Sequence, residues 1–297
     1  MDGFRHDYLS KTDTPNFDSM ISAGVTMPYV NNSFNTATFP SHYTMATGLF
    51  SESHGIVSNA MYDPVFDSTF SKKNKEPRWW DGGEPIWITA TKANKKAGVF
   101  FWPGSDVAVQ GIYPAEWRYY QEDVPFEDRV RAVVSWLSND DFDLAIAYFN
   151  EPDSTGHEWG PDHQEMLPVI RRMDRLLGFL MEELEKAGLK NATVLQRFGD
   201  KGDHGYDNTL DSMKPFFIAQ GPAFKQGASV EPIQNVDIYP LICFLLEIEP
   251  SANNGSLTRA KLLLNDKYLN GANLKTGCNF AFVTLLTFIV VHIRPFI

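Results

Sequence analysis

The distribution of apolar residues predicts alternating helices and short buried strands. A first helix is expected from Pro15, with Thr14 as its N-cap and Gly24 at its end, because its apolar residues share one face. Residues 97–102 and 144–149 are apolar runs without alternation, which is typical of strands buried on both faces of a parallel sheet. Each run ends directly in a polar motif, where ligands of open α/β sheets usually bind.

Between and after these runs the apolar period changes to that of a helix. Residues 126–137 and 166–184 carry apolar stripes at helical spacing, and Gly188 closes the second helix. Further strands are expected at 191–195 and 215–219, followed by a capped helix that carries residues 239–246. This alternation predicts an α/β fold with a doubly wound, mostly parallel sheet flanked by helices.

Composition limits the classes of partner. The 297 residues are 43% hydrophobic, enough for one large core, and 26 Lys and Arg against 37 Asp and Glu give a net charge of −11. A surface of this sign repels nucleic acid, so no nucleic-acid binding is expected. Cys243 and Cys278 form neither a disulfide scaffold nor a cysteine-based zinc site.

The signals for cellular compartment conflict. Sequons at Asn31, Asn191 and Asn254 suit a glycosylated, secreted protein. The chain as written starts without a signal peptide and would be expected to stay inside the cell. The apolar run at 280–291 is shorter than the roughly 20 residues of a membrane helix. It is read as a truncated membrane anchor, as the tail of a lipid-anchor signal, or as an ordinary buried segment.

The loop at 36–44 carries the first candidate chemistry. A threonine-rich turn followed by Pro40 and a helical segment would place the Thr38 hydroxyl at a helix N-terminus, where unpaired N–H groups attract phosphate. Phe39 could hold a flat group beside it. The alternative for these residues alone is a polar surface turn.

A metal site is the second candidate. Asp153 and His157 are spaced i, i+4, which puts a carboxylate and an imidazole on one face of a helical turn, and His204 is the natural third ligand. Without a third ligand, the pair would be a solvated turn.

Five sequence motifs, taken in their order along the chain, resemble those of a known family. They lie at residues 2–5, 36–56, 102–107, 151–157 and 202–208. Together they resemble the ectonucleotide pyrophosphatase/phosphodiesterase family, its fourth and fifth members in particular. The resemblance implies a zinc-dependent phosphodiesterase fold of the alkaline phosphatase superfamily, with a catalytic domain at 1–264 and a tail at 265–297. It also implies a location on the extracellular face of a membrane.

The resemblance implies two zinc ions, but this chain carries a complete set of ligands for one of them and an incomplete set for the other. One site would be complete, with Asp153, His157 and His204. For the other, Asp2 and Thr38 match, but the family's adjacent Asp-His pair has no counterpart. The missing pair is attributed to an internal deletion near residues 196–197. The strand before Asp2 is also absent from the sequence, so the central sheet is expected to lack core strands.

The resemblance also implies roles in catalysis and substrate binding. Thr38 would be the nucleophile that forms a phosphothreonine, and Ser41, where the family has Asn, would donate to the phosphate. The nucleotide would contact Phe39, Tyr120, Tyr148, Trp102, Pro103 and Asp106, with Lys75 toward its distal phosphates. Activity is expected to be impaired because half of one metal site is missing. The alternatives are a non-catalytic cell-surface binding protein of the same fold, or a related phosphomonoesterase or sulfatase.

Overall fold

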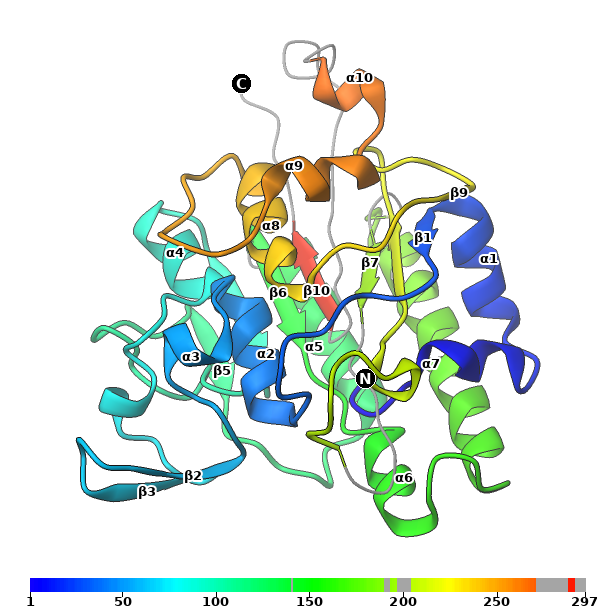
Figure 1. The fold of residues 1–297 in the computed structure, drawn as a ribbon. Helices are drawn as coiled ribbons and strands as arrows, with labels where there is room; N and C mark the ends of the chain where they lie inside the picture. Colours follow the sequence, from blue (N-terminus) through cyan, green and yellow to red (C-terminus); the bar gives the residue numbers. More distant parts are fainter. Residues whose placement is uncertain (140, 190–192, 197–203, 271–287, 292–297) are drawn as a thin grey trace.

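An eight-stranded sheet forms the centre of the protein (Figure 1). The computed structural model describes residues 1–139, 141–189, 193–196, 204–270 and 288–291. Strands β8 and β10 run opposite to the other six. In spatial order the strands are β5 (Glu116–Arg118), β4 (Ala97–Phe100), β6 (Leu144–Ala147), β10 (Phe288–Val291), β7 (Thr193–Gln196), β8 (Phe217–Gln220), β1 (Val25–Met27) and β9 (Ala228–Ser229).

Helices cover both faces of the sheet (Figure 1). One face packs against α1 (Pro15–Ala23), α5 (Phe126–Asn139) and α7 (Met166–Lys186). The other packs against α2 (Thr38–Thr47), α4 (Ile86–Lys92) and α8 (Ile238–Leu246). The predicted doubly wound α/β architecture is therefore confirmed, as helix, sheet and helix layers.

Strand β6 shows how its sequence divides between the two layers. Leu144 and Ile146 are buried against the α2, α4 and α8 side, whereas Ala145 and Ala147 are buried against α5 and α7. An unbroken apolar run is what a strand covered on both faces requires. On β4, Gly98 is needed because a Cβ there would lie 2.5 Å from the Trp136 ring of α5.

Shorter elements complete the fold. A two-stranded hairpin of β2 (Ala60–Asp63) and β3 (Ser68–Ser71) extends from the sheet (Figure 1). The short α-helices are α3 (Ser51–His54), α6 (Asp153–Trp159), α9 (Leu257–Ala260) and α10 (Asp266–Leu269). The 3₁₀ turns lie at His6–Ser10, Pro77–Trp79, Asp211–Met213, Asn235–Asp237 and Lys261–Leu263.

Part of the C-terminal apolar run lies inside the sheet. Strand β10 pairs antiparallel with β6, placing Phe288 opposite Ala147, and with β7, placing Ile289 opposite Val194. Of the three interpretations of this run, the structure thus supports a core segment for 288–291. Residues 271–287 and 292–297 lie outside the described part. Among the described residues, every helix is too short or too polar to cross a bilayer.

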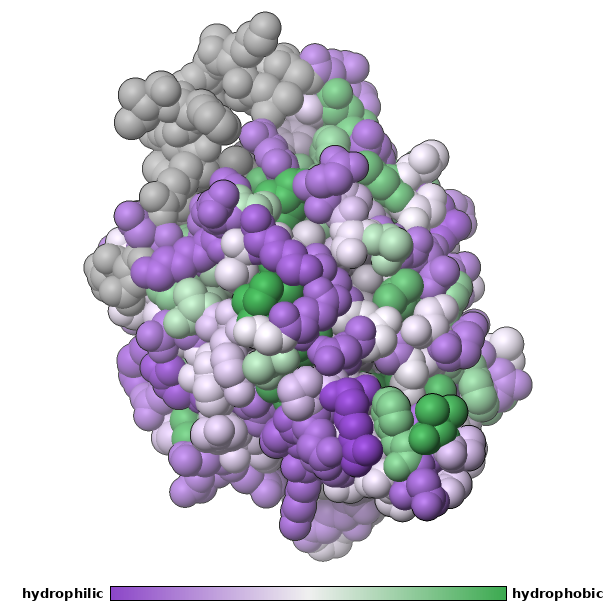
Figure 2. Space-filling model, turned by 90° about the vertical axis from the view of Figure 1, so that its left-hand side faces the viewer, coloured by the Kyte–Doolittle hydropathy of each residue, from purple (hydrophilic) through white to green (hydrophobic). Residues whose placement is uncertain are grey.

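The surface on one side of the molecule is mostly polar. Figure 2 shows one face as mostly hydrophilic, with small and separate hydrophobic patches. This face offers no broad apolar area to a partner.

A buried histidine links stability to pH. His54 of α3 accepts the Ile56 N–H at Nδ1 over 3.2 Å, so its hydrogen lies on Nε2, which is 2.9 Å from Thr44 Oγ1. Burial lowers the pKa of His54 to about 3, from 6.5 in an exposed histidine. Between these values the unfolded chain binds a proton that the folded chain does not.

We therefore expect the His54 contribution to stability to be full above about pH 6.5 and to fall as the pH drops toward 3. Its limiting slope is about 1.4 kcal/mol per pH unit. Urea unfolding between pH 4 and 7 would measure this slope. His54→Gln should flatten it, whereas His163→Gln, at an exposed position, should not. Equal slopes in all three proteins would refute the assignment.

Candidate active site

The candidate site lies where β4 and β6 end and α2 begins. Thr38 is the first residue of α2, with Ala37 as its N-cap. The Phe39 N–H donates to Asn59, Pro40 has no N–H and the Ser41 N–H donates to Ala37, so the Thr38 N–H is the donor that the first turn can offer the site. Asp153 opens α6 a few residues beyond the end of β6. The sheet and one helix N-terminus thus hold the predicted nucleophile and the first predicted metal ligand.

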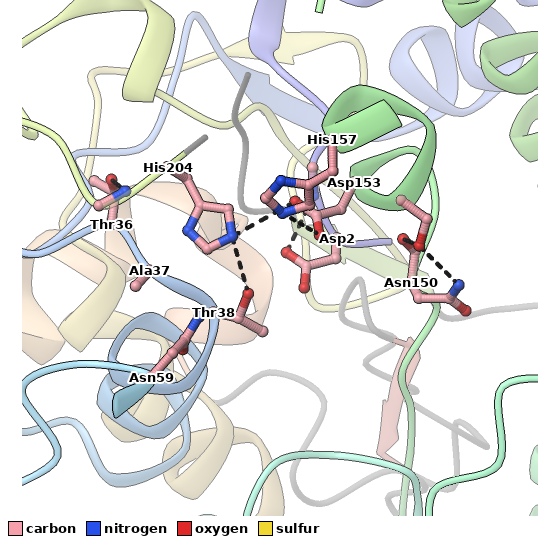
Figure 3. A network of polar contacts seen from close by, with 12 residues as sticks. Asp2, Thr36, Ala37, Thr38, Asn59, Asn150, Asp153, His157 and His204 are labelled. Carbon is pink, nitrogen blue, oxygen red and sulfur yellow. Dashed lines mark hydrogen bonds and ion pairs between the residues drawn. The ribbon is translucent and has the colours of Figure 1, made fainter. Parts of the chain in front are cut away.

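The three predicted ligands of the first metal are brought together (Figure 3). His157 Nε2 lies 3.3 Å from Asp153 Oδ2, and His204 Nε2 lies 3.8 Å from Asp153 Oδ1. Each residue offers one ligand atom, and these atoms all lie within 4.8 Å of one another. Asp153 Oδ1 is buried and has no hydrogen-bond partner among the described residues. A buried carboxylate oxygen in this state fits a cation-binding position.

Thr38 belongs to the same cluster. Its Oγ1 is 3.4 Å from His204 Nε2 (Figure 3). The i, i+4 pair of Asp153 and His157 is therefore joined by a third ligand from a remote loop. This excludes the alternative of an isolated solvated turn.

Asp2 is fixed against the Asp153 segment through the backbone. The Asp2 N–H donates to the Phe149 carbonyl at 2.6 Å, and the Asp153 N–H donates to the Asp2 carbonyl at 3.0 Å. Gly3, with φ of +67°, is required because a Cβ there would lie 2.1 Å from Asp153 Cα. The N-terminal segment thus carries a second carboxylate to the metal ligands.

Tyr148 completes this arrangement. Its buried hydroxyl donates to Asp2 Oδ2 at 2.7 Å. Burial, followed by the charges of Asp2 and Asp153, raises the pKa of Tyr148 well above its ordinary value. The hydroxyl therefore stays protonated and acts as a donor.

The two carboxylates respond differently to burial. Burial, and then the negative charge of Asp2, raises the pKa of Asp153, although His157 and His204 oppose this. For Asp2, burial is outweighed by His42, His204 and the Tyr148 hydroxyl, which together lower its pKa. Two buried like charges side by side favour a cation between or beside them.

A cavity of about 630 Å³ opens above the cluster. Its lining includes Thr38 and the three predicted ligands of the first metal. It also includes every residue predicted to contact the substrate: Phe39, Lys75, Trp102, Pro103, Asp106, Tyr120 and Tyr148. The structure therefore gathers residues from six separate segments around one space, and their roles stay predictions.

The contacts of these lining residues refine the predicted roles. Lys75 Nζ lies 2.7 Å from Asp106 Oδ2, so this cation is paired with a carboxylate of the cavity wall. Tyr120 meets Tyr148 edge-on, with ring centroids 6.0 Å apart at 69°. Tyr148 binds Asp2 through its hydroxyl, whereas Tyr120 is 46% exposed and Phe39 is half-buried. Phe39 and Tyr120 are thus better placed to stack on a base.

Ser41, the predicted phosphate donor, lies beside the cavity without lining it, and its role stays a prediction. Its side chain is fully buried, does not line the cavity, and its hydroxyl donates to the Asn35 carbonyl at 3.4 Å. Ser41 is at i+3 from Thr38, on the same side of α2 but one turn further into the helix.

Asn59 is the residue that sequence reasoning missed. Its Oδ1 accepts the Phe39 N–H at 2.8 Å, which places the amide beside Thr38 (Figure 3). Because Oδ1 accepts this bond, Nδ2 is the donor end of the amide, although Asn59 is not among the residues that line the cavity. Asn59 lies 20 residues after Phe39, and no periodic or motif signal connects the two positions.

Two sequons fall on described residues. Asn31 and Asn254 are both exposed, as an acceptor of a glycan must be, and Asn254 Oδ1 also accepts the Phe50 N–H at 3.0 Å. Asn191 lies outside the described residues, as do Gly202 and Asp203 of the motif around His204.

The fold and this site define a phosphodiesterase of the alkaline phosphatase type. The chain belongs to the type I phosphodiesterase/nucleotide pyrophosphatase family, whose model matches residues 1–254. This confirms the resemblance to the ectonucleotide pyrophosphatase/phosphodiesterase family. Because members of this family hydrolyse phosphodiester bonds, the chain belongs to a family of enzymes.

Two curated relatives show the extent of the match. Bis(5'-adenosyl)-triphosphatase enpp4 of Xenopus laevis is 32% identical over 384 residues, covering 96% of this chain and 85% of that protein. Ectonucleotide pyrophosphatase/phosphodiesterase family member 5 of Homo sapiens is 32% identical, covering 89% and 76%. The first alignment is longer than the 297 residues of this chain, so segments of the relative have no counterpart here.

Solved structures agree with this assignment. The inactive murine ectonucleotide pyrophosphatase/phosphodiesterase 5 in complex with AMP is 30% identical, with a TM-score of 0.87 over 89% of this chain and 98% of that one. The human protein gives 31% identity and the same TM-score, over 90% and 98%.

The bond from Tyr148 to Asp2 yields a stability prediction. Tyr148→Phe removes a buried donor to a carboxylate, which should lower the free energy of unfolding by about 1.5–3 kcal/mol. Urea unfolding at pH 7 would measure the change. Tyr62→Phe is the matched control, because this exposed hydroxyl donates to Asp67 and its loss should change stability little. Equal effects would show that burial does not strengthen the Tyr148 bond.

Proposed function

We propose that this chain is a zinc-dependent hydrolase that cleaves phosphodiester or pyrophosphate bonds of nucleotides with Thr38 as its nucleophile. One observation carries the proposal. Thr38 stands at the N-terminus of α2, with its Oγ1 3.4 Å from His204 Nε2, at the floor of the cavity. A hydroxyl, a ligand cluster and a helix N-terminus therefore face one space.

The donor set fits zinc. One carboxylate and two imidazoles from Asp153, His157 and His204 would hold it and leave a further position open. When bound, zinc would supply Lewis-acid stabilisation and lower the pKa of an oxygen that it contacts. For a second zinc, Asp2 and Thr38 are the ligands that the family resemblance provides in this chain.

The reaction assigns definite tasks to the residues of the chain. Thr38 Oγ1 would attack phosphorus and lose its proton as the bond from phosphorus to the leaving oxygen breaks. The resulting ester of Thr38 would then be hydrolysed by water, which restores the hydroxyl. The Thr38 N–H at the start of α2 would bind a nonbridging oxygen, and the Asn59 amide would hold the neighbouring Phe39 N–H.

A nucleotide is the proposed substrate. The murine relative is solved with AMP, and the curated name of the amphibian relative specifies a bis(5'-adenosyl) triphosphate. Phe39 and Tyr120 would contact the base, because stacking on aromatic rings tolerates any base. Trp102, Pro103 and Asp106 would line the adjacent wall, and Lys75 would approach distal phosphates.

Reduced turnover is part of the proposal. The adjacent Asp-His pair expected for the second zinc has no counterpart in the sequence. Loss of several kcal/mol of stabilisation of the transition state would cost a factor of about a thousand or more. We further propose glycosylation at Asn31 and Asn254 and a location at the extracellular face of a membrane, as expected for the family.

Zinc binding is tested by titration calorimetry of the metal-free protein. Asp153→Asn should weaken zinc at least about 100-fold, because even residues that only support a ligand contribute 10-fold to 100-fold. Asp211→Asn makes the same substitution at an aspartate that is 83% exposed and paired with Lys214, and it should leave the affinity unchanged. Equal affinity in all three proteins would refute the metal site.

Nucleophilic catalysis is tested on a nitrophenyl ester of a nucleotide with saturating zinc. Thr38→Ala should lower nitrophenolate release by about a thousandfold or more, and Thr38→Ser, which keeps a hydroxyl, should retain part of it. A wild-type protein that binds zinc and nucleotide but releases no nitrophenolate would establish the non-catalytic alternative. A preference for the phosphate monoester would instead indicate a phosphomonoesterase.

A further inference from the structure

We propose that Arg129 is a positioning residue that holds three walls of the nucleotide cavity in register, an inference that rests on the proposed function of this cavity. Arg129 lies on α5 and does not line the cavity. Its side chain is fully buried. Any effect on a nucleotide must therefore pass through the residues that it contacts.

Arg129 carries a buried positive charge without a carboxylate partner among the described residues. No carboxylate within the described residues forms an ion pair with it, and a buried charge without compensation is costly. Burial accordingly lowers its pKa from the ordinary value. Such a group persists in a folded protein only where other dipoles replace water.

Backbone carbonyls supply that replacement. Nη1 donates to the Tyr148 carbonyl at 2.9 Å, and Nε and Nη2 both donate to the Val124 carbonyl, at 3.2 and 3.0 Å. Longer contacts reach the Glu122 carbonyl at 3.4 Å and Asn150 Oδ1 at 3.5 Å. The guanidinium thus joins the loop after Tyr120 to the segment that follows β6.

Aromatic rings enclose the same guanidinium. Its Cζ lies 4.6 Å from the Phe126 centroid, 5.1 Å from Phe101 and 5.7 Å from Phe149. These distances are within the range of cation–π attraction. Phe101 follows β4, so the contact brings a third segment to the same point.

The contacted segments are the walls of the cavity. Phe101, Glu122, Tyr148 and Asn150 all line it, and Tyr120 is two residues from Glu122. One planar group thereby fixes the spacing between the exposed ring of Tyr120 and the wall that leads to Asp153. A lysine would keep the charge but lose the fork of donors that reaches two segments at once.

The experiment compares Arg129→Lys and Arg129→Met with Arg172→Met. Arg172 of α7 contacts the same Phe126 ring as Arg129, with its Cζ 4.5 Å from the ring centroid, but Arg172 is exposed. It therefore controls for the loss of an arginine beside Phe126. Zinc-loaded proteins are titrated with AMP, and amide hydrogen exchange of residues 119–124 is measured without nucleotide.

We expect Arg129→Met to weaken AMP binding at least about 10-fold, since small displacements of binding groups have large effects. Exchange at 119–124 should accelerate at least about 10-fold. Zinc affinity should stay within about threefold, Arg129→Lys should give intermediate values, and Arg172→Met should match wild type.

Unchanged exchange at 119–124 in both Arg129 variants would overturn the proposal, as would a parallel loss of zinc and AMP affinity. If Arg129→Met does not fold, Arg129→Lys alone decides between these outcomes. Failure of the wild-type protein to bind AMP would refute the proposed function, while the exchange measurement would still test the positioning role.

Discussion

Two buried carboxylates, those of Asp2 and Asp153, lie side by side at the candidate active site, and much of the surrounding structure holds them in place. Asp2 and Asp153 are joined through the backbone, because the Asp153 N–H donates to the Asp2 carbonyl. Their repulsion contributes to the raised pKa of Asp153. The groups that oppose it are the Tyr148 hydroxyl, two imidazoles and, when bound, a cation. His157 lies on α6 beside Asp153, whereas Asp2 and His204 come from segments remote in sequence, so this arrangement depends on the assembled fold.

The three-layer fold brings these groups together because its short strands end close to the site. Strand β6 alternates its side chains between the two helical layers and ends just before Tyr148, a few residues ahead of Asp153, the first predicted ligand. Helix α2 lies on the opposite layer from α5 and presents Thr38 at its first turn. The site therefore draws on both layers and on the sheet edge between them, as expected where strands of an open α/β sheet end.

Sequence reasoning recovered what depends on local pattern. The apolar stripe predicted the helix at 166–184, observed as Met166–Lys186, and the unbroken apolar runs predicted β4 and β6. Residues matched through motifs converged on one cavity. Ser41 was predicted from its spacing to Thr38, but spacing does not give burial: its side chain is buried outside the cavity lining, and its role stays a prediction. Asn59 was missed because its contact with Phe39 is made by a loop that carries no periodicity.

The apolar run near the C-terminus shows why hydrophobicity alone could not settle its structure. A membrane anchor, a lipid-anchor signal and a buried strand are all apolar, and they differ only in where their backbone N–H and C=O groups find partners. Residues 288–291 find theirs on both sides, in β6 and β7. Without β10, strands β6 and β7 would each have an edge of unpaired backbone N–H and C=O groups. Strand β10 closes this gap, so a segment remote from the chemistry in sequence contributes to the spacing of the elements that carry it.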